Sequence, residues 1–208
     1  MIYNGGVAGY MSGQEVIKLI RDVLKLKPDM IIVYDGVNDA VANDKYPLMH
    51  GYAEKVYRYA SAHIDAIEGY YDTEEICRGI ASQGSRFDNW LSNIRTMHAI
   101  ASDRNIRFFG LCQPNLWSKR VMATQEKNMI LSIMSRHISN LIEGAFRKSI
   151  EQLPELPDYI YDLSHILDGQ SNVYIDLCHL WEKGNEIVAE EVKKIILPAI
   201  EGINIKRK

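Results

Sequence analysis

Short apolar runs alternate with longer helical patterns along this chain, and that alternation constrains the fold more than any other feature of the sequence. Met30–Tyr34 and Ile106–Cys112 are compact apolar runs, and Val173–Ile175 is a shorter one. Runs of this kind, separated by helical stretches, are typical of buried strands in a mostly parallel sheet. The sequence therefore predicts an α/β domain, and 208 residues suit a single domain spanning 1–208.

Four stretches repeat apolar residues at the 3.6-residue period of an α-helix. Ser12–Glu15 is a capping-box pattern that is expected to open the first of these helices, which ends before Pro28. The apolar positions of the four predicted helices are Val16, Leu19, Ile20 and Val23; Phe87, Trp90, Leu91, Ile94, Met97 and Ala101; Ile130, Ile133, Met134, His137, Ile138 and Leu141; and Val188, Val192, Ile195 and Ile196. The tyrosine-rich region 44–84 is interpreted as a helical insertion over the strand ends, whose tyrosines either line a ligand crevice or only pack the insertion.

Composition and charge exclude several classes of protein. The net charge is -3 and the basic run is confined to Lys206–Lys208, so we expect no nucleic-acid partner. We expect no membrane span, because no apolar run is long enough, and no signal peptide at the start of the chain. The location is expected to be cytoplasmic unless an upstream segment carries a signal. The cysteines Cys77, Cys112 and Cys178 lack metal-ligand spacing, so we expect unpaired thiols, no metal and no cofactor.

Three polar or glycine-rich stretches follow predicted strands, and the carboxyl ends of parallel strands converge on one crevice. Asn4–Tyr10 is glycine-rich, which lets backbone N–H groups approach a ligand. Gly36–Asp39 contains an asparagine whose amide could stabilise developing negative charge. Asp176–His179 places a carboxylate three residues before a histidine, a spacing that suits a general base and the group that orients it. Taken singly, each stretch is a weak signal, and the first two are more typical of a turn or a helix cap.

Taken in order, the three stretches resemble the second, third and fifth sequence blocks of the SGNH (GDSL-like) hydrolase family. The resemblance implies a three-layer α/β/α, flavodoxin-like sheet, and it assigns each candidate residue a role. Gly6 would donate a backbone N–H to the oxyanion, and Asn38 would donate its side-chain amide. His179 would be the general base and Asp176 the group that orients it. The implied activity is hydrolysis of a small-molecule or carbohydrate ester, such as a sugar O-acetyl group.

The chain departs from the family pattern at the first block, Gly-Asp-Ser, which supplies the nucleophile on the first, central strand and occurs nowhere in this sequence. We expect an N-terminally truncated SGNH domain with one of two features: an open slot with exposed apolar residues beside Met30–Tyr34, or an edge there that a partner chain shields by oligomerisation. Ser12 is not expected to replace the nucleophile, since the capping box uses its hydroxyl. Two alternatives stay open: a non-catalytic binding module, and attack by water activated by the Asp–His pair or by a metal that Asp176 and His179 help to hold.

Overall fold

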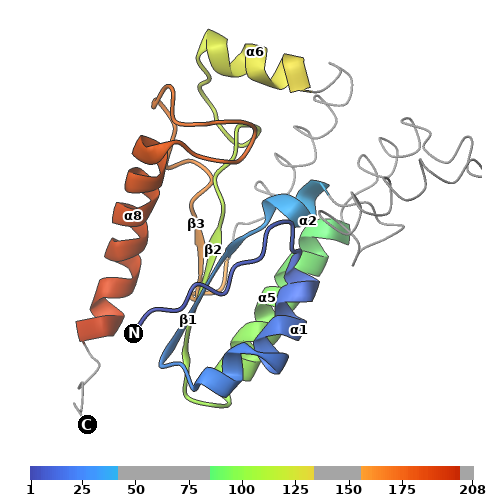
Figure 1. The fold of residues 1–208 in the computed structure, drawn as a ribbon, viewed down its shortest axis with the longest axis vertical. Helices are drawn as coiled ribbons and strands as arrows, with labels where there is room; N and C mark the ends of the chain where they lie inside the picture. The colour runs from blue at the N-terminus through green and yellow to red at the C-terminus, as the bar shows by residue number, and fades with distance from the viewer. Residues whose placement is uncertain (42–84, 134–155, 202–208) are drawn as a thin grey trace, which may run out of the picture.

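The fold is mixed α/β and is built on a small parallel sheet (Figure 1). The computed structural model describes residues 1–41, 85–133 and 156–201. The sheet contains β1 (Met30–Asp35), β2 (Arg107–Cys112) and β3 (Ile160–Asp162), in the order β1-β2-β3. Both pairings are parallel, so the carboxyl ends of all three strands lie at the same edge of the sheet.

Helices cover both faces of this sheet and give three layers. The helical elements are α1 (Ser12–Arg21), the 3-10 turn η1 (Val23–Leu26), α2 (Val37–Val41), α5 (Ser85–Ser102), α6 (Thr124–Ile133) and α8 (Glu182–Glu201). Figure 1 shows α1 and α5 on one side of the strands and α8 on the other. The α/β fold with a parallel sheet that the sequence predicted is therefore present in the described residues.

The face covered by α1 and α5 buries the larger apolar cluster. Its buried members are Leu19, Ile31, Trp90, Ile94, Met97, Ala101, Phe108 and Ile160. Gly110 on β2 makes the close packing of α5 feasible, because a Cβ atom added there would lie 3.1 Å from Cγ2 of Ile94. The helical period of α5 correctly predicted that Trp90, Ile94, Met97 and Ala101 are buried, whereas Leu91 is half-buried.

The opposite face of the sheet packs against α8. Phe109 and Leu111 alternate with Phe108 and Gly110 along β2, and they point to the α8 side, where Ile195 of α8 packs against them. Because β2 lies between two strands and two helical layers, four of its six residues are buried. The three large side chains among them, Phe108, Phe109 and Leu111, each contribute about 1.5–3 kcal/mol relative to an exposed side chain.

Three local predictions were wrong. The run Val173–Ile175 is not a strand: only an isolated antiparallel bridge joins Tyr174 to Leu180. The third strand is instead β3, which is too short for periodicity to reveal it. The N-cap of α1 is Met11 and not Ser12, and Ile20 is 54% exposed although the helical pattern placed it on the buried face.

One edge of β1 pairs with no other strand among the described residues. Ile32 is 42% exposed and Tyr34 is 37% exposed, so β1 carries exposed apolar side chains in the described part of the chain. The slot expected beside Met30–Tyr34 is therefore open in the described part of the chain. The insertion predicted at 44–84, and the predicted helical positions beyond Ile133, lie outside the described residues. No described helix is long and apolar enough to cross a membrane.

Candidate functional site

The Asp176–His179 stretch forms the tip of a tight loop between β3 and α8. The N–H of Ile175 donates to the His179 carbonyl at 2.8 Å, and the N–H of Trp181 donates to the Val173 carbonyl at 2.9 Å. These two bonds fold the chain back on itself on either side of Asp176. The stretch does not directly follow a strand as the sequence predicted, but the loop lies at the carboxyl-end edge of the sheet (Figure 1).

Asp176 holds both the backbone and the ring of His179. Its Oδ1 accepts the N–H of Cys178 at 3.0 Å and that of His179 at 2.8 Å, and its Oδ2 lies 2.7 Å from His179 Nδ1. Partial burial raises the pKa of Asp176, but the two backbone N–H groups and the ring outweigh that effect and the pKa is lowered. The ionised carboxylate therefore fixes Nδ1 as the protonated nitrogen and leaves Nε2 as the acceptor.

The reactive side of His179 faces solvent. Its side chain is 72% exposed, whereas that of Asp176 is 39% exposed. A neutral imidazole whose Nδ1–H is held by a carboxylate can accept a proton at Nε2 and is stabilised when it becomes charged. The local geometry is therefore that of an oriented general base.

Cys178 lies beside this pair and is not a nucleophile. Its Sγ is 3.8 Å from His179 Nδ1. Burial, and then the negative charge of Asp176, raise the pKa of the Cys178 thiol to about 12. The thiolate is the nucleophilic form of cysteine, so this thiol is unreactive at neutral pH. The side chain packs against the buried cluster of the loop, as expected for a small apolar residue.

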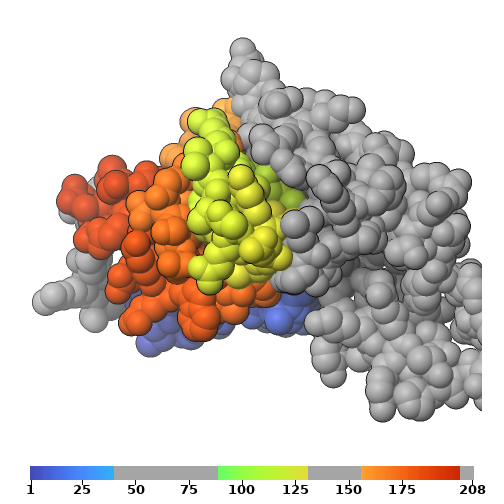
Figure 2. Space-filling view, turned by 90° about the horizontal axis from the view of Figure 1, so that it is seen from above, coloured from blue at the N-terminus to red at the C-terminus, as the bar shows by residue number. Residues whose placement is uncertain are grey.

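Backbone contacts fasten the loop to the segment that follows β2. The N–H of Leu116 donates to the Leu177 carbonyl at 2.9 Å, and Nε2 of Gln113 donates to the Cys178 carbonyl at 3.4 Å. Viewed from above, the loop (orange) and the segment after β2 (yellow-green) lie side by side (Figure 2). The Asp–His pair is thereby fixed to the carboxyl end of β2.

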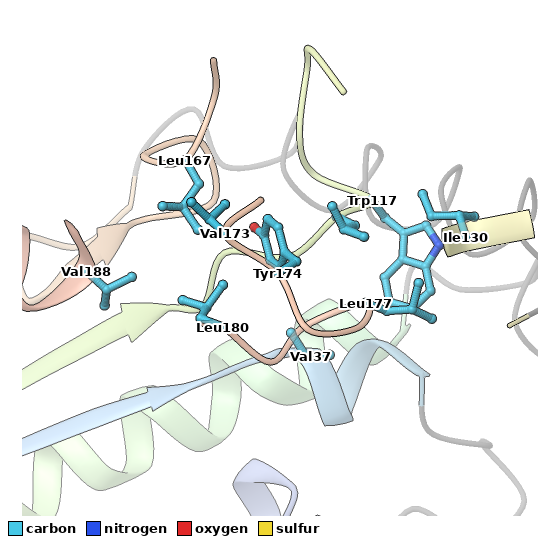
Figure 3. Close-up of a cluster of buried hydrophobic side chains, with 10 residues drawn as sticks. Val37, Trp117, Ile130, Leu167, Val173, Tyr174, Leu177, Leu180 and Val188 are labelled. Carbon is cyan, nitrogen blue, oxygen red and sulfur yellow. The ribbon is translucent and has the colours of Figure 1, made fainter. Parts of the chain in front are cut away.

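An apolar cluster joins the same loop to α2, which follows β1. Val37, Leu177 and Leu180 belong to one buried cluster, together with Tyr174 and Trp117 (Figure 3). Val37 immediately precedes Asn38, and Leu177 lies inside the Asp176–His179 stretch. The structure therefore places the asparagine segment and the histidine loop at one end of the sheet, as the convergence of parallel strands predicts.

Asn38 is half-buried on α2, and its side-chain amide is partly used. Its Nδ2 donates to the carbonyl of Tyr10 at 2.9 Å. An asparagine amide carries two N–H donors, so this bond accounts for one of them. The bond also ties α2 to the segment that leads into α1. The remaining donor is the group available to an oxyanion.

Gly6 is in an exposed segment, and its N–H is occupied. It donates to Oδ1 of Asn4 at 2.9 Å, in a local turn. Residues 1–8 are all exposed. Of the four candidate residues, Asp176 and His179 are in contact, and Asn38 lies at the same end of the sheet. Among the described residues, the Gly6 N–H bonds to Asn4 and not to this group. A complete oxyanion hole is therefore not assembled here.

A group of buried acids beneath α2 was missed by the sequence reasoning. Ser12 is fully buried, and its N–H and hydroxyl both donate to the Asp39 carboxylate. Trp90 Nε1 donates to Asp35 Oδ1 at 2.8 Å. Burial, followed by the charge of Glu15, raises the pKa of Asp35 well above its ordinary value. An aspartate closing an apolar strand was the available signal. Ser12 is thus excluded as a nucleophile by burial and by its bond to Asp39.

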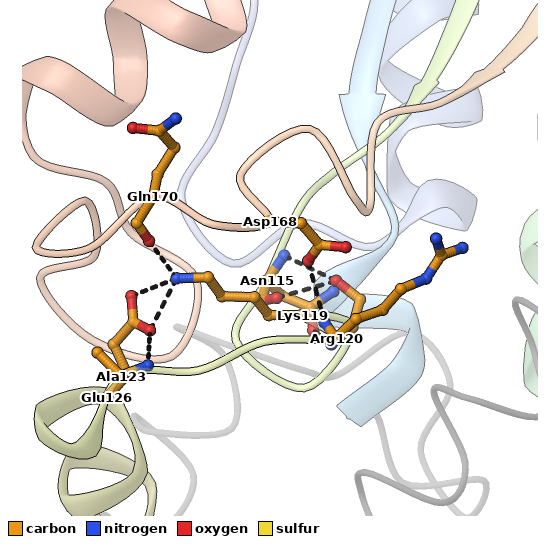
Figure 4. A network of polar contacts seen from close by, with 8 residues as sticks. Asn115, Lys119, Arg120, Ala123, Glu126, Asp168 and Gln170 are labelled. Carbon is orange, nitrogen blue, oxygen red and sulfur yellow. Dashed lines mark hydrogen bonds and ion pairs between the residues drawn. The ribbon is translucent and has the colours of Figure 1, made fainter.

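A buried ion pair lies in the segment that follows β2, and its lysine also reaches the segment that follows β3 (Figure 4). Lys119 Nζ lies 2.6 Å from Glu126 Oε1 and 2.7 Å from Oε2, and it also donates to the Gln170 carbonyl. The side chains are 2% and 4% exposed. The Arg120 N–H donates to Asp168 at 2.9 Å. These bonds tie the segment after β2 to the segment after β3, which carries the Asp–His pair.

Metal-ligating side chains gather at one place in the described residues. One donor atom each from Asp176, Cys178 and His179 lies within 4.8 Å of the other two.

Comparison with known proteins adds no relative: no protein-family model, curated protein or solved structure matches the chain.

Proposed function

We propose that this chain carries the base and oxyanion groups of an SGNH-type ester hydrolase. The observation that supports the proposal most directly is the 2.7 Å contact between His179 Nδ1 and Asp176 Oδ2, with the ring exposed to solvent. The SGNH-like order of the three sequence stretches is independent support. The substrate class is a carboxylic ester, such as the O-acetyl group of a sugar.

In this reaction His179 Nε2 takes the proton from an attacking hydroxyl and later delivers it to the departing alcohol. Asp176 keeps the ring oriented and stabilises the imidazolium that forms. The free N–H of the Asn38 amide stabilises the negative charge that develops on the carbonyl oxygen. Gly6 contributes a second N–H once substrate displaces the side chain of Asn4.

The nucleophile comes, in this proposal, from a Gly-Asp-Ser segment outside the 208 residues. Ser12 and Cys178 do not supply the nucleophile. The Ser12 hydroxyl is buried against Asp39, and the Cys178 thiol is protonated. The open edge of β1, with Ile32 and Tyr34 exposed, offers backbone partners and apolar contacts to the strand that carries this segment.

The test compares hydrolysis of a short-chain aryl ester by two proteins. The 208-residue chain should show little turnover, and the chain extended by the sequence encoded immediately upstream should be active. In the extended protein His179→Ala should lower turnover by about 10³-fold or more, the usual cost of losing a triad member. His165→Ala is the matched control, because His165 also pairs with an aspartate three residues on, Asp168, at 3.6 Å. Equal losses in the two variants would contradict the proposal.

The alternative is a non-catalytic binding module that keeps the crevice of such a hydrolase. It is favoured by one observation: the Gly6 N–H and one Asn38 amide N–H are bonded to Asn4 and Tyr10. A binding module would retain a carbohydrate ester without cleaving it, in both the short and the extended protein. Calorimetry with an acetylated oligosaccharide, followed by product analysis, distinguishes binding from turnover.

A further inference from the structure

The three donor atoms at the loop tip form a triangle of metal-binding size. His179 Nδ1 lies 2.7 Å from Asp176 Oδ2 and 3.8 Å from Cys178 Sγ, and one donor atom of each residue lies within 4.8 Å of those of the other two. Around a tetrahedral zinc ion, bond lengths of about 2.0–2.3 Å separate neighbouring donors by about 3.3–3.6 Å. The two distances from Nδ1, 2.7 Å and 3.8 Å, therefore reach this geometry through changes of less than about an ångström at side-chain termini.

The chemistry of the donor set selects the metal. One imidazole nitrogen, one sulfur and one carboxylate oxygen suit zinc, whereas calcium and magnesium require mainly oxygen ligands. Asp176 Oδ1 is occupied by two backbone N–H groups, which hold the carboxylate in place and leave Oδ2 as the ligand. His179 and Asp176 are exposed enough for an ion and its bound water to enter from solvent.

We propose that Asp176, Cys178 and His179 bind a zinc ion through Oδ2, Sγ and Nδ1, with water as the fourth ligand. Binding exchanges the thiol proton of Cys178 for the metal and releases that proton to solvent, while the ring proton of His179 leaves Nδ1 and one proton is taken up at Nε2. The three ligands come from one four-residue turn, so the site needs no rearrangement of the sheet or helices.

Zinc at this position would also regulate the proposed hydrolase. The ion occupies His179 Nδ1 and Asp176 Oδ2, the two atoms whose contact orients the general base. It also leaves the ring proton on Nε2, the nitrogen that must accept a proton in catalysis. The zinc-bound and the catalytically competent states therefore exclude each other. This consequence rests on the proposed function, whereas the metal site itself does not.

The experiment titrates the purified 208-residue chain with Co²⁺, which reports tetrahedral thiolate coordination in its absorption spectrum. Saturable visible bands and a near-ultraviolet thiolate charge-transfer band are expected, and both should disappear when Zn²⁺ displaces the cobalt. Cys178→Ser should remove the charge-transfer band and weaken binding at least about tenfold, and His179→Ala should weaken it similarly. The control is Cys77→Ser/Cys112→Ser, which leaves Cys178 as the single thiol and should keep the spectrum.

The proposal is overturned if the chain shows no saturable cobalt spectrum, or if Cys178→Ser leaves spectrum and affinity unchanged. Circular dichroism of each variant separates a lost ligand from a lost fold, and Asp176→Asn provides a second ligand variant. No ester is used in these measurements. The two proposals can therefore fail separately. If the chain binds metal but the extended protein shows no ester hydrolysis even after treatment with a chelator, the proposed hydrolase function is contradicted and the zinc site is still supported.

Discussion

Glu126→Gln tests how much the buried Lys119–Glu126 ion pair contributes to the stability of the chain. Glutamine has nearly the same shape and can still accept the Ala123 N–H, which Glu126 Oε2 accepts at 2.9 Å. The substitution removes the negative charge that lies 2.6 Å and 2.7 Å from Lys119 Nζ. Lys119 would then keep the Gln170 carbonyl and a neutral amide around a buried ammonium.

The expected cost is large because the pair is almost fully removed from solvent, at 2% and 4% exposure. Breaking a buried pair at one partner costs about 3–5 kcal/mol, and a domain of this size has about 5–15 kcal/mol in total. With a urea m-value of about 2 kcal/mol per molar, the unfolding midpoint should fall by about 2 M. Equilibrium urea unfolding, followed by tryptophan fluorescence and circular dichroism, measures the shift.

Two further variants make the result interpretable. Lys119→Met/Glu126→Leu removes both charges and should be more stable than Glu126→Gln, because no charge is left buried. Glu190→Gln breaks the exposed pair with Lys193 on α8 and should leave the midpoint unchanged. A fall of less than about 0.5 M in Glu126→Gln, or a double variant no better than the single one, would refute the reasoning.

Three other outcomes follow from buried or exposed groups. Burial raises the pKa of Asp35, so between its ordinary and its folded pKa the folded chain holds a proton that the unfolded chain has lost, and stability falls as pH rises through that window. Asp35→Asn should flatten this fall in urea midpoints measured from pH 5 to pH 8, and the part that persists comes from Glu15, whose pKa is also raised. Gly184→Ala should destabilise the chain by about 1–3 kcal/mol despite the helix propensity of alanine, because the new Cβ would lie 2.7 Å from the Val173 carbonyl oxygen, and an unchanged urea midpoint would contradict this. Ile32→Lys at the open edge of β1 should reduce self-association in analytical ultracentrifugation, and an unaltered sedimentation profile would argue against edge pairing.

The sequence by itself determined the elements whose signals are local. The 3.6-residue period of Trp90, Ile94 and Met97 predicted the buried face of α5. The contact between Asp176 and His179 was equally accessible, because residues three apart in a tight turn meet without help from the rest of the chain. The resemblance to the SGNH family rests on such short local patterns and stays a prediction.

Tertiary structure alone decided what depends on residues far apart in the chain. Whether Ser12 caps its own helix or bonds to Asp39 was settled by the approach of α2, 27 residues away. Sequence reasoning also missed the bond between Asn38 and the Tyr10 carbonyl, because the two residues are far apart in the chain. The three-residue strand β3 was missed for the same reason, since it forms by pairing with β2. Lys119 is the clearest case, because a lysine side chain is normally exposed. Its burial is stabilised by the Glu126 carboxylate on α6 and by the Gln170 carbonyl, and only the tertiary structure brings these groups to the ammonium.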